Sequence, residues 1–110
     1  MCAFVAGNGN YKGLPPLKNP VPDASAMKVL LEAEHVEVFD AYDCDINEFE
    51  EKFSLFLASL RPGDAALLYF AGHAAMFNNS LRLMAMSNSA NPDLERRSMN
   101  LDVLKARLET

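Results

Sequence analysis

His73 is the residue of this sequence that is best placed to do chemistry. It follows an apolar stretch, AALLYFA, and stands between Gly72 and Ala74, so little bulk covers its imidazole. An imidazole titrates near neutral pH and can take or give a proton during catalysis. A lone histidine more often only bonds a loop carbonyl, so the residues around it must decide between the two roles.

The sequence has two cysteines, Cys2 and Cys44, and neither is expected to be a nucleophile that works with His73. Their number and spacing fit neither a disulfide framework nor a zinc site. Cys2 opens the first apolar stretch and should lie at the other end of the sheet from His73, roughly 15 Å away. Cys44 should lie at the same edge as His73, but it follows the second expected strand instead of the strand that leads to His73. We expect Cys2 to be a buried filler and Cys44 a loop thiol.

Other motifs fall short of a cofactor or metal site. GNGNYKG has Lys12 where a dinucleotide fingerprint needs glycine, and Pro15-Pro16 follow where a helix should begin. Asp40, Asp43 and Asp45 lack the glycine turn and distal glutamate of a calcium loop, which favours a solvated acidic loop. No G-x-S-x-G is present, so a serine hydrolase is unsupported. We expect no cofactor.

Composition narrows the class of protein further. The chain has 110 residues, enough for one domain, and a net charge of −5, which argues against binding nucleic-acid backbones. The start, MCAFVAG, has no basic region of a signal peptide, and no apolar run approaches the ~20 residues that span a bilayer. With no disulfide framework, the expected location is the cytoplasm, without membrane contact.

Strands and helices are expected to alternate along the chain. Apolar runs predict strands over Cys2–Ala6, Val36–Ala41 and 65–71, the last one central and covered on both faces. A helix should begin at Asp23 as N-cap and present Met27, Leu30 and Leu31 on one face.

The second half of the chain adds the clearest helix. Its apolar positions recur at helical spacing and are Phe49, Phe53, Phe56, Leu57 and Leu60. A hairpin arm over Leu81–Met86, a polar loop over Asn88–Ser98 and a last helix with Leu101, Leu104 and Leu108 complete the order. This alternation predicts an α/β fold with a mostly parallel sheet and helices on both faces. Sites in such sheets form beyond the carboxyl ends of the strands, where the Gly7–Pro22 loop, 43–45 and His73 should meet.

Two segments resemble one known family. YFAGHAA resembles the YFAGHG segment of caspase-like cysteine peptidases, and AFVAGNGNYKGLPPLKNPVPDA resembles that family's first strand and loop. The resemblance covers essentially all 110 residues. Paracaspases look closest, including Asn79-Ser80 after the histidine segment, with metacaspases and caspases further away. It implies a caspase-like three-layer sandwich, with residues 1–110 as the N-terminal half of one domain, truncated before the strand that carries the nucleophile.

The resemblance also implies roles for particular residues. His73 matches the catalytic histidine, flanked by Gly72 and Ala74. The family usually has glycine at the position of Ala74, whose backbone N–H helps to bind the oxyanion, and a misplaced donor would cost ~10²–10³ in rate. Asp23 matches an acidic residue that binds arginine or lysine ahead of the scissile bond, in competition with its role as N-cap. The LMAMSNS segment lacks the proline and aspartate that usually follow the hairpin strand.

Three functions therefore stay open. The first is a fragment of an endopeptidase that cleaves peptides or proteins after a basic residue and is inactive without its cysteine. The second, favoured by Ala74 and LMAMSNS, is a non-catalytic homologue that acts as a regulatory or interaction module, for example in a caspase-like homo- or heterodimer. The third is an unrelated flavodoxin-like or receiver-like binding domain, which the proline-rich first loop disfavours.

Overall fold

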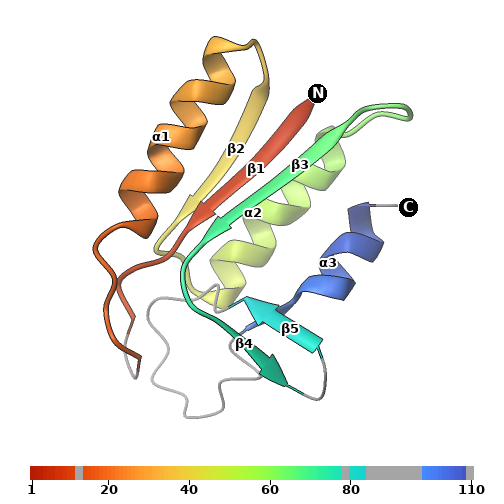
Figure 1. Ribbon diagram of the computed structural model, residues 1–110. Helices are drawn as coiled ribbons and strands as arrows, with labels where there is room; N and C mark the ends of the chain where they lie inside the picture. The colour runs from red at the N-terminus through yellow and green to blue at the C-terminus, as the bar shows by residue number, and fades with distance from the viewer. Residues whose placement is uncertain (12–13, 78–79, 84–97, 109–110) are drawn as a thin grey trace.

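The computed structural model describes residues 1–11, 14–77, 80–83 and 98–108 (Figure 1). In chain order the elements are β1 (Cys2–Gly7), α1 (Pro20–Ala33), β2 (Glu37–Tyr42), α2 (Ile46–Ser59), β3 (Ala66–Ala71), β4 (Ala74–Phe77), β5 (Ser80–Leu83), β6 (Met99–Asn100) and α3 (Leu101–Leu108). This is the alternation that the hydrophobic pattern predicts, with the short strand β6 in addition.

The main sheet is parallel and has the order β2-β1-β3. Cys2 is level with Glu37 and with Ala66, and Gly7 is level with the last residues of both neighbouring strands. The three carboxyl ends therefore form one edge, with α1 and α2 on opposite faces of the sheet (Figure 1). The predicted α/β fold, a parallel sheet with helices on both faces, is confirmed. The described sheet has β1 in the centre and β3 at an edge, so a further strand paired with β3 would be needed for 65–71 to be central.

The core is built on Phe4, which has no exposed surface. Its ring lies 5.4, 5.3 and 5.6 Å from the rings of Phe49, Phe53 and Phe56, all on α2. Asp45 starts α2 by a capping box, because its carboxylate accepts the N–H of Glu48 at 2.8 Å while the Glu48 side chain accepts the N–H of Asp45. The helical spacing of phenylalanines thus fixes which face of α2 covers the sheet.

Helix α1 starts earlier than the sequence pattern predicts. It begins at Pro20, with Asn19 as N-cap residue, so the prediction that Asp23 caps it is wrong. Proline is favoured in the first turn because its fixed φ suits the helix and it has no N–H to leave unbonded. Asp23 lies in that turn with its side chain exposed. Leu30 is also 60% exposed and does not share the buried face.

Small residues let α1 approach β1 closely. Pro20 and Ala24 are its buried residues. A Cβ atom at Gly7 would lie 2.5 Å from the carbonyl oxygen of Pro20 and 2.9 Å from the Cβ of Ala24. Glycine is therefore needed at the end of β1, where the chain leaves the sheet for the long loop.

A small antiparallel sheet of order β4-β5-β6 follows the main sheet. It includes Leu81–Leu83 of the predicted hairpin arm; the remainder of that arm and most of the predicted loop, including LMAMSNS beyond Leu83, lie outside the described residues. Arg82 ties β5 to Ser98 by two hydrogen bonds, of 2.7 and 3.1 Å. Among the described residues, no helix is long and apolar enough to cross a membrane.

The last helix, α3, packs on the α2 side of the core. Leu104 is fully buried there, as the apolar spacing predicts. Arg107 bonds both carboxylate oxygens of Glu50 at 3.1 and 3.0 Å. Its guanidinium also lies 4.9 Å from the ring centroid of Phe53. Both hydrogen bonds come from one guanidinium nitrogen, Nη1, and together with the contact to the ring they fix α3 against α2.

Candidate active site at the carboxyl edge of the sheet

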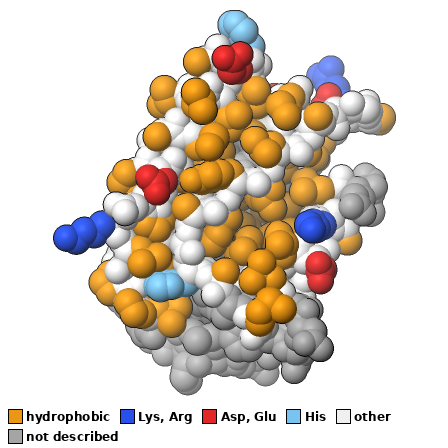
Figure 2. Space-filling model, viewed as in Figure 1, with side chains coloured by type: hydrophobic (Ala, Val, Ile, Leu, Met, Phe, Trp, Pro, Cys, Tyr) orange, Lys and Arg blue, Asp and Glu red, His pale blue; other side chains and the backbone are white. Residues whose placement is uncertain are grey.

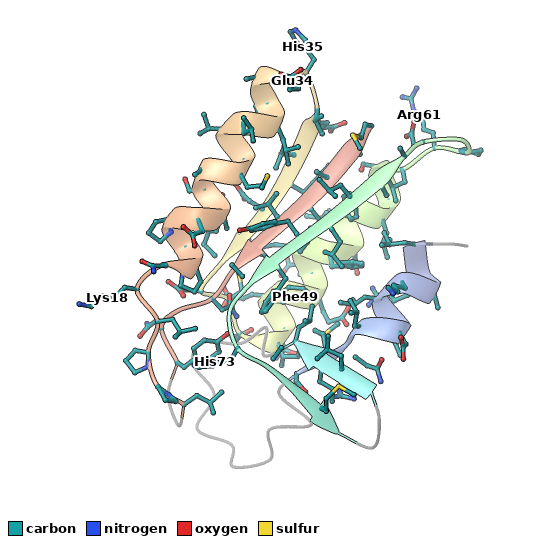
Figure 3. All side chains as sticks on the ribbon, viewed as in Figure 1. Lys18, Glu34, His35, Phe49, Arg61 and His73 are labelled. Carbon is teal, nitrogen blue, oxygen red and sulfur yellow. The ribbon has the colours of Figure 1, made fainter. Side chains whose placement is uncertain are left out.

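The segments that leave β1, β2 and β3 are joined directly at this edge. The N–H of Asn8 donates to the carbonyl of Ala71 at 2.9 Å, and the N–H of Asp43 donates to the carbonyl of Gly7 at 2.9 Å. His73 lies at this end of the molecule, whereas the other histidine, His35, lies at the far end of α1 (Figure 3). The meeting of the three segments, predicted from the parallel sheet, is confirmed.

The imidazole of His73 is held by a backbone carbonyl. Its Nε2 atom lies 2.7 Å from the carbonyl oxygen of Pro15. A carbonyl oxygen only accepts, so Nε2 carries the proton of this bond. In the neutral imidazole, Nδ1 is then the nitrogen without a proton. The arrangement gives His73 one nitrogen for orientation and leaves the other as a base.

Tyr11 holds both the backbone and the ring of His73. The N–H of His73 donates to the Tyr11 hydroxyl oxygen at 3.0 Å, and the ring centroids are 4.7 Å apart with a tilt of 58°. Only 6% of Tyr11 is exposed, and burial raises its pKa from 10.0 to about 12. The hydroxyl therefore stays protonated at neutral pH.

Sequence reasoning missed Tyr11 and Pro15 as individual site residues. The signal was partial. The loop from Gly7 to Pro22 was expected to be functional, and Tyr11 is its single aromatic residue. Every residue has a backbone carbonyl, so the residue type of Pro15 does not indicate that its carbonyl contacts His73. Only the folded chain shows this contact.

Asp43 anchors the start of this loop. It has a positive φ of 49°, which aspartate tolerates better than most residues. Its Oδ1 atom accepts the N–H groups of Gly9 at 2.8 Å and Asn10 at 3.0 Å. One carboxylate at the end of β2 thus fixes the backbone that leads to Tyr11.

The carboxylates of the predicted acidic loop are not only solvated, because each of them bonds a backbone N–H group or a lysine. Asp45 caps α2, and Asp40 pairs with Lys28 at 2.6 Å. That pair raises the pKa of the Lys28 amine. No group of three or more potential metal ligands occurs among the described residues.

Gly72 is packed closely against the side chains and backbone of the site. A Cβ atom there would lie 2.6 Å from the Tyr11 hydroxyl oxygen, 2.9 Å from the Phe70 ring and 3.1 Å from the Asn8 carbonyl oxygen. Glycine is needed because Tyr11 fills the space that a side chain would take. Ala74, on the other side of His73, begins β4 and has its side chain exposed.

Asp23 and Gly72 line the same hollow. Its volume is about 290 Å³, and its lining is Leu17, Lys18, Asn19, Pro20, Asp23, Ala71 and Gly72. Two residues that the resemblance singled out, 49 positions apart in the chain, therefore line one hollow beside His73. The exposed carboxylate of Asp23 is the acidic group of this hollow, and Lys18 is its basic one.

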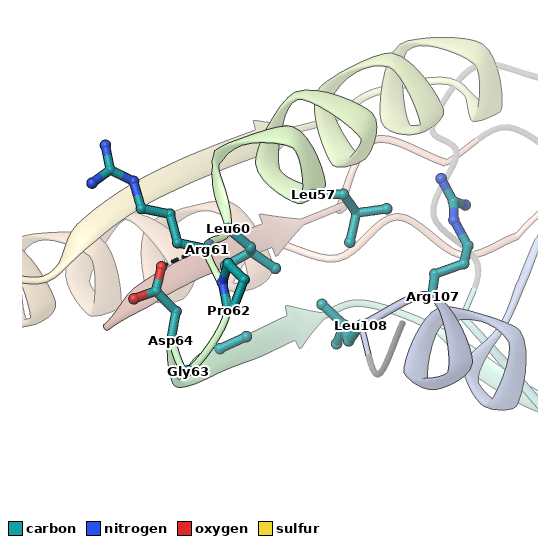
Figure 4. A pocket seen from close by; sticks show the side chains of 9 residues that line it. Leu57, Leu60, Arg61, Pro62, Gly63, Asp64, Arg107 and Leu108 are labelled. Atoms are coloured by element: carbon teal, nitrogen blue, oxygen red, sulfur yellow. Dashed lines mark hydrogen bonds between the residues drawn. The ribbon is translucent and has the colours of Figure 1, made fainter.

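A larger hollow, of about 450 Å³, lies at the opposite end of β3 (Figure 4). Its apolar side chains come from Leu57, Leu60, Pro62, Ala66 and Leu108. It contains none of the site residues predicted from the sequence. Figure 2 shows the two histidines at opposite ends of a face on which hydrophobic side chains gather over the sheet.

Neither cysteine reaches His73. Cys2 is 4% exposed, begins β1 at the far end of the sheet, and its sulfur lies 3.5 Å from the Ser59 hydroxyl oxygen. Cys44 is 2% exposed and donates to the carbonyl of Tyr42 at 3.6 Å. Burial raises the pKa of the Cys44 thiol above 9.0. The prediction that both thiols have no part in catalysis agrees with these positions, although Cys44 is more deeply buried than expected of a loop thiol.

The sequence as a whole matches a family model for the caspase domain over residues 1–109. The chain belongs to the caspase family. A search of curated proteins found no match. The unrelated flavodoxin-like or receiver-like domain is excluded.

Proposed function

We propose that these 110 residues are the histidine-bearing half of a caspase-like cysteine endopeptidase domain of the paracaspase or metacaspase type. The observation that carries the proposal is the 2.7 Å contact between Nε2 of His73 and the Pro15 carbonyl. It orients the imidazole and leaves Nδ1 to act as a base. The nucleophilic cysteine would lie on a strand that pairs with β3 and is not among these residues.

In this proposal His73 moves the protons of peptide hydrolysis. Nδ1 takes the proton of the cysteine thiol, and the thiolate attacks the scissile carbonyl. The imidazolium then gives that proton to the leaving amine, which departs as the acyl-enzyme forms. Water, deprotonated by the same nitrogen, releases the acid product. Throughout these steps, the Pro15 carbonyl stabilises the Nε2–H side of the ring.

The hollow beside Gly72 is the proposed pocket for a basic substrate residue. A carboxylate such as that of Asp23 is the natural partner of a guanidinium or ammonium group. The Asp23 side chain does not cap helix α1, because Asn19 is the N-cap residue. The carboxylate therefore remains available, which supports cleavage after arginine or lysine.

Peptide binding by the 110-residue chain tests this pocket. A short peptide ending in arginine should shift the NMR signals of Gly72 and Asp23, whereas the same peptide ending in citrulline should not. Asp23→Asn should weaken binding about tenfold, through loss of one charge-assisted contact. Glu34→Gln removes an exposed acid from the other end of α1 and is the matched control. Equal binding of both peptides would rule out Asp23 as the specificity residue.

A non-catalytic regulatory or interaction module is the second candidate, and Ala74 is the observation that favours it. His35 and Asp43 are the only non-glycine residues with positive φ in the described part of the chain, so Ala74 has an ordinary backbone. If the oxyanion donor needs the conformational freedom of glycine here, its N–H is misaligned. Ala74→Gly in a form that contains the cysteine should then raise kcat about 10²-fold; an unchanged kcat would remove this argument.

Catalysis by His73 is tested in any natural form of the protein that contains the cysteine. His73→Ala should abolish cleavage of an arginyl peptide, and His35→Ala should leave it unchanged. Retained activity in His73→Ala would refute the role of this residue. A cytoplasmic location, a caspase-like homo- or heterodimer and the lack of nucleic-acid or membrane partners stay predictions.

A further inference from the structure

Tyr11 contacts His73 in two ways, and neither contact takes part in the proposed proton transfers. Tyr11 is 62 residues away in sequence, yet its hydroxyl accepts the backbone N–H of His73 at 3.0 Å. Its ring lies against the imidazole at 4.7 Å. A single side chain therefore restrains both the position of the His73 backbone and the plane of its ring.

Tyr11 is itself held on two sides. Gly72 leaves room for its hydroxyl, since a Cβ there would lie 2.6 Å from that oxygen. On the other side, the Asp43 carboxylate accepts the N–H groups of Gly9 and Asn10, the two residues that precede Tyr11 in the loop. The chain of contacts runs from the end of β2, through the loop after β1, to the end of β3.

We propose that Tyr11 is the positioning residue that keeps His73 in the tautomer with its proton on Nε2, and that Asp43 sets Tyr11 in place. If the His73 backbone shifts, the 2.7 Å contact with the Pro15 carbonyl is lost. Either nitrogen of the neutral ring can then carry the proton. The inference rests on the proposed function for its purpose, and its test needs neither the cysteine nor a substrate.

The test is NMR of the 110-residue chain with ¹⁵N-labelled histidine. At a pH where His73 is neutral, wild type should show a protonated Nε2 and an unprotonated Nδ1. Tyr11→Phe keeps the ring but removes the acceptor, so the two nitrogens should move toward averaged shifts. The His73 amide should exchange about threefold to tenfold faster, as expected for the loss of one hydrogen bond. Tyr69→Phe, the same change on β3, should alter neither signal.

Further observations separate positioning from general destabilisation. The amides of β1 should keep their protection in Tyr11→Phe. Asp43→Gly tolerates the positive φ but removes the carboxylate, and should produce the same mixed tautomers without a change at Tyr11 or His73. Unchanged His73 nitrogen shifts in both variants would overturn the proposal, as would a wild-type His73 amide that exchanges like an exposed one. Failure of His73-dependent cleavage would instead remove the peptidase function alone.

Discussion

The Nε2 atom of His73 lies 2.7 Å from the carbonyl oxygen of Pro15, across 58 residues of sequence. The contact joins the end of β3 to the loop after β1, which the parallel sheet brings to the same edge. A carbonyl keeps its accepting character at every pH at which a protein is folded, so it orients the imidazole in both its neutral and its charged form. This separates the orienting nitrogen from the reacting one.

The 110-residue chain alone should show no endopeptidase activity. Covalent catalysis needs a nucleophile beside the base, and both cysteines are buried away from His73. Incubation with a fluorogenic arginyl peptide measures this, with a known cysteine peptidase as the positive control. Cleavage by the pure chain that is lost in His73→Ala would contradict the prediction.

Cys44 should react slowly with iodoacetamide at neutral pH. Burial raises the pKa of its thiol above 9.0, so the reactive thiolate is scarce, and its side chain is only 2% exposed. The rate should rise as pH increases through a midpoint above 9.0. Mass spectrometry of the labelled peptide gives the rate, and the unfolded chain in denaturant is the reference. Equal rates for folded and unfolded chains would show that Cys44 is not protected.

Gly72→Ala should destabilise the fold by about 1–3 kcal/mol, because the new methyl group overlaps the Tyr11 hydroxyl. Gly63→Ala is the matched control. Gly63 also has a positive φ, of 87°, but nothing lies within 4 Å of the added Cβ. Its cost should be about 1 kcal/mol from backbone strain alone. Urea denaturation compares the two, and a Gly72→Ala variant no less stable than Gly63→Ala would show that Tyr11 moves freely.

Stability should fall between about pH 10 and about pH 12 in part because of Tyr11. The folded state keeps the phenol proton up to a pKa of about 12, whereas the unfolded state loses it near 10.0. In that interval the folded state binds more protons, so the free energy of unfolding decreases as pH rises. Tyr11→Phe should show a shallower decrease than wild type when stability is measured by urea denaturation across this range. Identical slopes in wild type and Tyr11→Phe would mean that Tyr11 titrates alike in both states.

The elements most predictable from sequence were those fixed by hydrophobic periodicity. The phenylalanine spacing identified the buried face of α2, because burial of large rings outweighs any competing local preference. The start of α1 was misplaced because Asp23 has the residue type of an N-cap, while proline at the first turn lets the helix begin at Pro20.

The site was predictable only in outline. A histidine between small residues after a buried strand pointed to the carboxyl edge, and the resemblance supplied Asp23 and Gly72 as its neighbours. The contacts of Tyr11, Pro15 and Asp43 depend on the path of a long loop, and each of the three involves a backbone group that every residue shares. Residue types alone do not reveal such contacts.

The proposed peptidase domain is best tested by sequencing the native transcript past the codon for Thr110. We expect an open reading frame that continues through an apolar strand and ends that strand in aspartate-x-cysteine. A nucleophile there would complete the site around His73. A stop codon immediately after Thr110 would rule out the proposed endopeptidase and favour a non-catalytic module.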